Sequence, residues 1–598
     1  MGWKKYYRGK FDPIWISDFR EYVEKALPLH GDRVALAMDV PGQGFLQFTF
    51  NEIAEKARAV GTFLVEKLGL KKGDRVAIIS ESRPEWGTIY FGTGGAGLTT
   101  VPVDVFLSSE EMVFPLSHSE TRVVFVSPAQ YDKFVAIRSK LKNIRAVVHI
   151  SKDIPQKVES VENFTIWQVY EEGTKLVDEG SDAFYRYPIN PEEDVASLVY
   201  TSGTTGISKG VMLTHKNIIE DANLILEAVP VRPTDRVVSV LPLHHTYECT
   251  AGLVAILYAG AYIEYAPSLK SRVLIATFRK VRPNKFLAVP LLLERFYKGM
   301  WKALRKRGFF PYIFLRLLFF LSAFLGKLGV KAGKFLLKPV LSRVGLDNIE
   351  FVVSGGGPIS PELIKSYETV GIMILQGYGL TETSPVVAAE TPRYRRIGSV
   401  GKPLPGIEMK IHEPNPDGVG ELWVKGPVVM KGYYKNEEAT RKTITEDGWL
   451  RTGDLARMDS DGFVYITGRA KNLIVTKGGK NIYPEELELA ILQSPYILET
   501  VVFGIEDPDK GEIPYAVVVP DFEALQTLAK ERGFDLTPEK VEEIIGNEIK
   551  KYTAHMADYK RIRDFEIWET ELPKTSTKKV KRYVFGKNFV PKKRRGGK

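Results

Sequence analysis

Hydroxyl, glycine and lysine residues are concentrated in one short stretch of the chain, YTSGTTGISKG at residues 200–210. Glycine lets a backbone approach a ligand closely, hydroxyl and amide groups bind phosphate oxygens, and a lysine adds a positive charge. Lys209 lies between Ser208 and Gly210, so the Gly-Lys-Ser/Thr order of a Walker A loop is missing. The stretch predicts a polyphosphate-binding loop of another kind, with a plain surface turn as the alternative.

Two later segments carry residues that suit the rest of a nucleotide. Three glycines at 355–357 follow a strand-like run, and side-chain-free backbone at a strand end suits a planar base or a sugar. In QGYGLTET at 376–383, Tyr378 could stack on a base, Thr381 could reach a phosphate and Glu382 could hold Mg²⁺. Taken alone, either segment could be a turn.

A third glycine segment, GTGGAG at 92–97, matches the dinucleotide-binding pattern G-x-G-x-x-G. That pattern needs a strand directly before it, and here the strand-like run ends at Ser80. We expect small residues that pack a helix tightly against a sheet instead.

Elements that would position these segments alternate along the chain. Buried β-branched runs at 75–80, 122–127 and 236–241 are separated by longer helical patterns, which predicts parallel strands with crossover helices. A strand over 211–213 should lead into a helix capped by Thr214. Near residues 454–471 the pattern changes to antiparallel strands, followed by a smaller α+β set with a helix from about Pro484. We therefore expect an α/β fold in two domains, residues 1–467 and 468–598.

Composition constrains the cellular compartment and the kinds of partner. The single cysteine, Cys249, forms no intramolecular disulfide, which favours a reducing compartment, and the first residues lack an apolar run of signal-peptide length. We expect a cytoplasmic protein. The net charge is +10, and the basic tail at 592–595 lacks the aromatic residues of a nucleic-acid site, so no nucleic acid is expected as a partner.

Together these segments resemble the adenylate-forming (AMP-binding) superfamily, which includes acyl-CoA synthetases, peptide-synthetase adenylation domains and luciferases. The resemblance spans nearly the whole chain and rests on these motifs: 200–210, YGLTE at 378–382, Tyr434 with TGD at 452–454, GRAK at 468–471 and NIYPEE at 481–486. It implies a large N-terminal domain with parallel-rich sheets and flanking helices, and a small mobile C-terminal lid. It also implies two half-reactions, in which a carboxylate attacks the α-phosphate of MgATP and a thiol then attacks the acyl-AMP.

The resemblance also implies roles for single residues. The β- and γ-phosphates of ATP would be held by Ser202, Thr204, Thr205 and Lys209, and adenine would be framed by Gly355, Gly356 and Tyr378. The other nucleotide-binding residues that the resemblance implies are Thr201, Gly203, Gly206, Gly357 and Gly379. The α-phosphate and Mg²⁺ would be held by Thr381 and Glu382, with Thr204 as a second metal ligand. Asp454 and Arg469 would bind the ribose.

Three further residues complete the implied machinery. A C-terminal P-K-T-x-x-G-K pattern aligns its catalytic lysine with Lys579, although Lys578 replaces the usual glycine and stays an alternative. His245 falls where a histidine lies beside the acyl carboxylate, with a buried structural histidine as the alternative. Lys471 sits at the expected hinge between the domains.

The acid and the acceptor are less constrained. The segment FFPYIFLRLLFFLSAFL at 309–325 is apolar, broken by Pro311 and Arg316, and flanked by basic residues in a stretch from 301 to 346 that has no acidic residue. It predicts a helical hairpin on an anionic membrane surface, with a core helix or an oligomer contact as the alternative. This insertion is similar to that of long-chain fatty acyl-CoA synthetases, so a long-chain fatty acid and coenzyme A are the expected substrates. Acyl carrier protein as acceptor, a fatty acyl-AMP ligase without CoA transfer, a lipid-binding scaffold and a homo-oligomer remain open.

Overall fold

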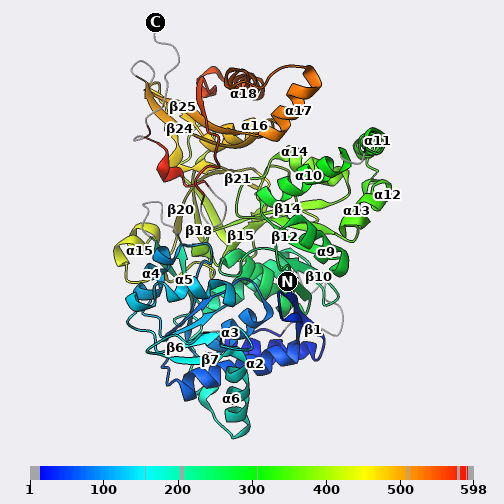
Figure 1. Cartoon of the computed structure of the whole chain (residues 1–598). Coiled ribbons are helices and arrows are strands. Elements are labelled where there is room, and N and C mark those ends of the chain that lie inside the picture. Colours follow the sequence, from blue (N-terminus) through cyan, green and yellow to red (C-terminus); the bar gives the residue numbers. More distant parts are fainter. Residues whose placement is uncertain are drawn as a thin grey trace.

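The structure is a computed structural model that describes residues 14–154, 156–201, 208–305, 308–330, 332–507, 511–574, 580–586 and 589. Two large sheets, each with helices against it, form the body of the molecule, and the C-terminal elements form a smaller group at one end (Figure 1). The expected α/β architecture is confirmed.

The first large sheet has nine strands in the described residues, and its central pairs are parallel. Its order is β16 (Lys402–Pro403), β15 (Val386–Ala389), β14 (Met373–Gly379), β13 (Phe351–Ser354), β12 (Lys285–Ala288), β10 (Arg236–Ser239), β11 (Tyr262–Tyr265), β1 (Val34–Val40) and β2 (Gly44–Thr49). Strands β12 and β10 are fully or mostly buried, as expected for parallel strands covered on both faces.

The second large sheet has eight strands among the described residues and is parallel except at one end. Its order is β19 (Gly432–Tyr433), β9 (Lys209–Thr214), β8 (Val195–Thr201), β4 (Thr99–Pro102), β3 (Arg75–Ile79), β5 (Val123–Val126), β6 (Ala146–His149) and β7 (Glu162–Thr165). Strands β8 and β9 are antiparallel, with Thr201 opposite Lys209, so the Gly/Thr-rich loop joins two paired strands. Residues 202–207 of that loop lie outside the described residues.

Smaller sheets follow. A four-stranded antiparallel sheet consists of β17 (Glu408–His412), β18 (Gly420–Lys425), β20 (Leu450–Met458) and β21 (Val464–Arg469). After it come β22 (Ile474–Val475) paired with β23 (Asn481–Ile482), and β24 (Ile497–Asp507), β25 (Gly511–Pro520) and β26 (Asp564–Ile567) in one sheet. Two hydrophobic clusters draw their buried members only from residues 474–585. The domain boundary at 467/468 remains a prediction.

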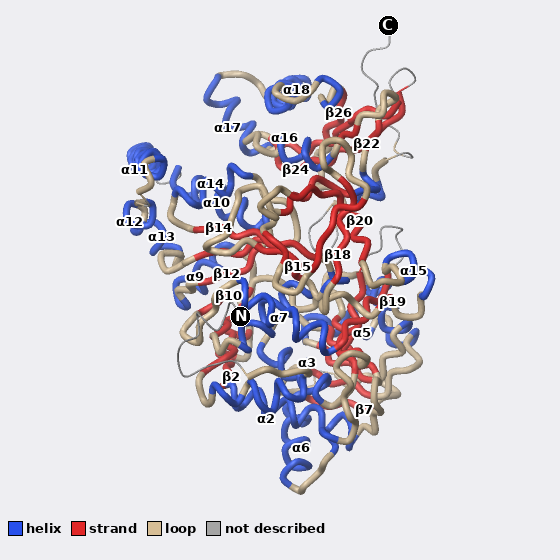
Figure 2. Tube along the Cα trace, turned by 180° about the vertical axis from the view of Figure 1, so that it is seen from behind, coloured by secondary structure: helices blue, strands red, loops and turns tan. Residues whose placement is uncertain are grey.

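Helices cover the sheets, which run through the middle of the molecule in the view from behind (Figure 2), and one helix also lies between the two large sheets. Every residue of α3 (Pro84–Gly95) is buried, and this helix contacts β1 and β2 of the nine-stranded sheet as well as β3 and β4 of the eight-stranded sheet. The α-helices that begin before residue 300 are α1 (Phe19–Glu21), α2 (Phe50–Thr62), α3 (Pro84–Gly95), α4 (Ser109–His118), α5 (Tyr131–Val135), α6 (Ile166–Asp178), α7 (His215–Ala228), α8 (Ala255–Tyr258), α9 (Ser271–Val281) and α10 (Pro290–Arg305). Those after it are α11 (Phe309–Lys327), α12 (Gly333–Leu336), α13 (Lys338–Val344), α14 (Pro361–Thr369), α15 (Glu437–Thr443), α16 (Pro484–Ile491), α17 (Phe522–Arg532) and α18 (Pro538–Thr553).

Local sequence explains where these helices begin. The side chain of Thr214 accepts a hydrogen bond from Asn217 N at 3.2 Å, and Asn217 Oδ1 accepts from Thr214 N at 3.0 Å. This reciprocal cap satisfies two of the amides that a helix start leaves without partners. The predicted cap at Thr214 is therefore confirmed.

The glycines at 92–97 lie at the end of α3, but their packing partner differs from the prediction. A Cβ on Gly92 would lie 2.4 Å from the carbonyl oxygen of Ala57, which belongs to α2, and one on Gly95 would lie 2.5 Å from Phe184. The close packing is therefore of helix on helix and of helix on an aromatic ring. The prediction of a sheet as the partner is wrong, because the pattern shows that a neighbour is close and does not show which one.

Candidate active site

One cavity of about 1930 Å³ collects the predicted site residues. It is bordered by both large sheets, the four-stranded sheet and the C-terminal elements. Every predicted site residue that the structure describes lines it: Thr201, Lys209, His245, Gly355, Gly356, Gly357, Tyr378, Gly379, Thr381, Glu382, Asp454, Arg469 and Lys471. The predicted residues Ser202, Gly203, Thr204, Thr205, Gly206 and Lys579, with the alternative Lys578, lie outside the described residues.

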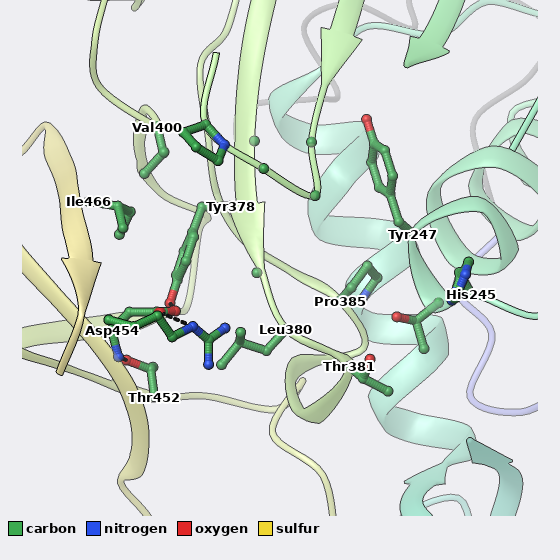
Figure 3. A pocket seen from close by; sticks show the side chains of 18 of the residues that line it. His245, Tyr247, Tyr378, Leu380, Thr381, Pro385, Val400, Thr452, Asp454 and Ile466 are labelled. Atoms are coloured by element: carbon green, nitrogen blue, oxygen red, sulfur yellow. Dashed lines mark hydrogen bonds and ion pairs between the residues drawn. The ribbon is translucent and has the colours of Figure 1, made fainter. Parts of the chain in front are cut away.

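Three side chains meet at one corner of the cavity (Figure 3). The hydroxyl of Tyr378 donates to Asp454 Oδ2 at 2.6 Å, and Arg469 Nε lies 2.7 Å from Asp454 Oδ1. Asp454 and Arg469 are opposite one another on β20 and β21, and Tyr378 comes from β14 of the nine-stranded sheet. Burial first, and then the charge of Asp454, raise the pKa of Tyr378, so its hydroxyl stays a donor. The corner can offer a carboxylate, a ring and a guanidinium to a polar ligand.

Glu382 lies in a second cluster with Tyr433. The hydroxyl of Tyr433 donates to Glu382 Oε1 at 2.8 Å, and Lys209 Nζ lies 4.7 Å from the centre of the Tyr433 ring. One tyrosine therefore connects the predicted metal ligand with the predicted phosphate-binding lysine. Burial, followed by the charge of Glu382, raises the pKa of Tyr433.

Sequence reasoning did not identify Tyr433 and singled out its neighbour. Tyr434 faces another way: its ring centre lies 5.5 Å from that of His118, and its amide donates to Gly210 O at 2.8 Å. Tyr433 is the last residue of the short strand β19 and Tyr434 directly follows it; successive side chains of extended backbone point to opposite sides, so one of the pair reaches Glu382 and the other does not. The alternation of side-chain direction along extended backbone was the sequence signal that could have distinguished Tyr433 from Tyr434.

The triple-glycine segment is close to a tyrosine that sequence reasoning left without a role. A Cβ on Gly355 would lie 2.9 Å from Cζ of Tyr247, whose hydroxyl donates to Val353 O at 3.0 Å. Gly356 has φ +78°, which favours glycine. The glycines thus make room for a ring of the chain itself as well as for a ligand.

Figure 3 shows His245 and Thr381 on the side of the cavity away from Asp454. Its ring centre is 4.3 Å from that of the buried His244, whose Nε2 is 3.1 Å from Asp104 Oδ1. The ligand atoms of Asp104, His244 and His245 lie within 4.8 Å of one another, close enough to share one cation. The pairing of Asp104 with His244 accounts for the same arrangement without a cation.

The C-terminal elements bring further cations to the cavity. Lys574 is paired with Glu499, Arg582 is paired with Glu488, and both basic side chains line the cavity. Partial burial, followed by the charges of Arg469 and Arg582, lowers the pKa of Lys471.

Part of the cavity lining is apolar, and we call it the apolar wall. Its members come from β12 and β13 of the nine-stranded sheet and from α7 and the residues after it: Ile225, Val229, Val231, Phe286, Leu287, Phe351 and Val353. Lys285 of β12 also lines the cavity and forms a buried ion pair with Asp235. The cavity therefore has a polar part and an apolar part.

Comparisons with known proteins agree with this geometry. The family model described as "AMP-binding enzyme" matches residues 23–434, and "AMP-binding enzyme C-terminal domain" matches residues 486–579. The long-chain-fatty-acid–CoA ligase FadD15 of Mycobacterium tuberculosis is 30% identical over 581 residues, 91% of each chain. Luciferin 4-monooxygenase of Photuris pensylvanica is 29% identical over 88% of this chain and 87% of its own. The chloroplastic long-chain-fatty-acid–[acyl-carrier-protein] ligase AEE15 of Arabidopsis thaliana is 28% identical over 90% and 80%.

Solved structures share the fold. The anthranilate CoA ligase AuaEII in complex with anthranoyl-AMP has a TM-score of 0.73 and 23% identity, covering 96% of this chain and 97% of its own. ATP-bound MatB from Rhodopseudomonas palustris has a TM-score of 0.70 and 23% identity, covering 95% and 98%. Because the first family model matches more than half of this chain, the chain belongs to the AMP-binding enzyme family of adenylate-forming ligases.

Proposed function

We propose that this enzyme activates a long-chain fatty acid with MgATP and transfers the acyl group to coenzyme A. A carboxylate oxygen attacks the α-phosphorus and the bond to pyrophosphate breaks. The CoA sulfur then attacks the acyl carbon, and AMP leaves. The observation that carries the proposal is that the residues of the polar corner and those of the apolar wall line the same cavity.

The polar part suits a nucleotide. Asp454 can accept hydrogen bonds from both ribose hydroxyls, and Tyr378 and Arg469 fix its carboxylate. Lys209 would bind the terminal phosphates together with the 201–206 loop, and Thr381 the α-phosphate. Gly355, Gly356, Gly357, Tyr378 and Gly379 would frame adenine.

We propose that Glu382 holds the magnesium ion that accompanies ATP. Its carboxylate lines the cavity and is the kind of hard oxygen ligand that Mg²⁺ prefers, with Thr204 as the second proposed ligand. Bound with ATP, the ion would offset the negative charge of the phosphates. Tyr433 would orient the Glu382 carboxylate toward it.

The apolar wall suits the acyl chain. Its members are Val, Ile, Leu and Phe side chains, against which a long hydrocarbon tail can be buried. His245 would lie beside the acyl carboxylate. Relatives named as long-chain ligases, such as FadD15, support this acid over a small polar one.

We also propose a two-step cycle in which domain 468–598 pivots relative to domain 1–467 at Lys471 and alternately brings Lys579 to the phosphates and admits the thiol. Lys471→Pro should fix one arrangement and slow one half-reaction more than the other. If each half-reaction runs as fast in Lys471→Pro as in the unmodified enzyme, Lys471 is not the hinge.

Acyl carrier protein is the second candidate acceptor. The relative AEE15 is named as an acyl-carrier-protein ligase, and the net charge of +10 would suit an acidic carrier. The deciding experiment follows AMP and pyrophosphate release with palmitate, MgATP and either CoA or acyl carrier protein. Thioester formed with CoA supports the proposal. Turnover with the carrier alone replaces it, pyrophosphate release without thioester indicates a fatty acyl-AMP ligase, and no turnover with either indicates a scaffold.

A further inference from the structure

We propose that helix α11 binds in the plane of an anionic lipid surface, with its outer face in contact with the lipid. This helix does not line the cavity, and its binding to lipid would be independent of the proposed function. Four features of the chain support it: the outer face of α11, its inner face, the charge around it, and its length.

The outer face is a continuous apolar stripe. Its members are four and three residues apart in turn, the spacing that places side chains on one side of a helix. Between 44% and 84% of each is exposed: Phe310, Phe314, Leu317, Leu321 and Phe324. Phe335 of α12 is 83% exposed and adds to the same region. Large aromatic and aliphatic side chains gathered in this way normally mark a contact surface.

The inner face holds α11 to the body of the enzyme. Leu315, Leu318 and Phe319 pack against the hydrophobic cluster that contains Phe286 and Ile359, both of which line the cavity. Ser322 Oγ donates to Thr369 O of α14 at 2.6 Å. Helix α11 therefore has apolar side chains on its outer face as well as on its inner face, and the described chain covers the inner face while leaving the outer one largely exposed. An apolar helix face of this kind requires a second apolar environment.

Charge identifies that environment. Residues 301–346 contain ten Lys or Arg and no Asp or Glu. A second copy of the chain on this face would bring like charges together, whereas an anionic headgroup layer attracts them and its acyl region accepts the Phe and Leu side chains. The observations therefore favour anionic lipid over self-association.

The helix would lie along the surface and would not cross it. Arg316 sits near the middle of α11, and the inner face is anchored to α14. In the part of the chain that the structure describes, no helix has the length and apolarity that a membrane span requires. Figures 1 and 2 both show α11 at the outer edge of the molecule, where a flat surface can reach it.

The test is sedimentation of the full chain with vesicles, without ATP or fatty acid. Binding to phosphatidylcholine vesicles that contain phosphatidylglycerol should exceed binding to phosphatidylcholine alone by at least about tenfold and should fall with salt. Leu317→Ser/Phe324→Ser should reduce that binding by at least about tenfold, because two apolar side chains leave the lipid. The matched control Leu29→Ser/Phe45→Ser changes two exposed apolar residues elsewhere and should bind as the unmodified chain does.

A fluorescent label reports the lipid contact directly, so this test does not depend on a loss of binding that misfolding of a variant would also cause. Cys249 is buried, so Phe310→Cys can carry an environment-sensitive fluorophore, with Phe45→Cys as the control. Emission should shift to the blue with anionic vesicles for the label at 310 alone. Equal binding to both vesicle types, an unshifted label at 310, or a solution dimer that Leu317→Ser/Phe324→Ser abolishes would each overturn the proposal.

Discussion

The Tyr378–Asp454–Arg469 corner and the outer face of α11 differ in whether the chain itself supplies partners for their side chains. In the corner, a buried carboxylate has its partners supplied by the chain itself, 2.6 and 2.7 Å away. On the outer face of α11, apolar side chains remain between 44% and 84% exposed. A satisfied polar cluster is set up to hold a ligand in one orientation, while an uncovered apolar face binds by area. The two regions should therefore respond to substitution in separate assays.

The largest effect is expected from Lys579→Ala. A lysine that meets charge appearing only in the transition state is worth on the order of 10²- to 10³-fold in rate. Acyl-AMP formation should fall by that amount, while conversion of supplied acyl-AMP with CoA should continue. Lys578→Ala is the control and should stay within about threefold. Equal loss of both half-reactions in Lys579→Ala would contradict the assignment.

Asp454→Asn should be next, with about a 100-fold fall in kcat/KM for ATP. The amide keeps the shape but loses the charge that pairs with Arg469, and hydrogen bonds to a charged group contribute about 1.5 to 3 kcal/mol each. Pyrophosphate release at varied ATP measures it. Asp461→Asn, at the exposed turn of the same β20–β21 hairpin, should change the value by less than about twofold. Similar losses in both variants would show that the hairpin fold, and not the corner, had been disturbed.

Tyr378→Phe should give a smaller loss, about tenfold in kcat/KM for ATP. The ring remains, so any stacking on adenine survives, and only the hydrogen bond to Asp454 is removed. Tyr378→Leu removes both and sets the scale. If Tyr378→Phe is as active as the unmodified enzyme and Tyr378→Leu is not, only the ring of Tyr378 contributes to activity. The hydrogen bond from Tyr378 to Asp454 would then play no part in ATP binding.

Leu317→Ser/Phe324→Ser should have the smallest effect on chemistry. Adenylation of a water-soluble medium-chain acid should change by less than about twofold, and the free energy of unfolding by less than about 0.5 kcal/mol. Pyrophosphate release and urea unfolding measure the two quantities. A large loss of either would show that α11 supports the cavity, and the contrast between the two regions would fail.

Local patterns predicted much of this molecule. The strands at 75–79, 123–126 and 236–239, the cap at Thr214 and the helix from Pro484 follow from side-chain periodicity and helix-start chemistry, which act over a few residues. Each described site residue taken from the family motifs lines one cavity.

Contacts between distant residues were beyond that reasoning. Tyr433 reaches Glu382 across 51 positions, and Tyr247 packs beneath Gly355 across more than a hundred. Such pairs are set by which strands become neighbours, and one sequence does not contain that information in any local pattern. The same limit led to the wrong packing partner for Gly92 and Gly95, because a glycine signals that something is close and leaves the neighbour unnamed.

The exposure of the α11 stripe has a practical consequence for engineering this enzyme. Side chains that stay in water in the folded chain contribute little to folding stability, so a screen for thermal resistance or solubility would score polar replacements there as neutral or beneficial. Such a screen would remove the stripe early while leaving the melting temperature unchanged. Only a selection carried out in the presence of lipid would register the change.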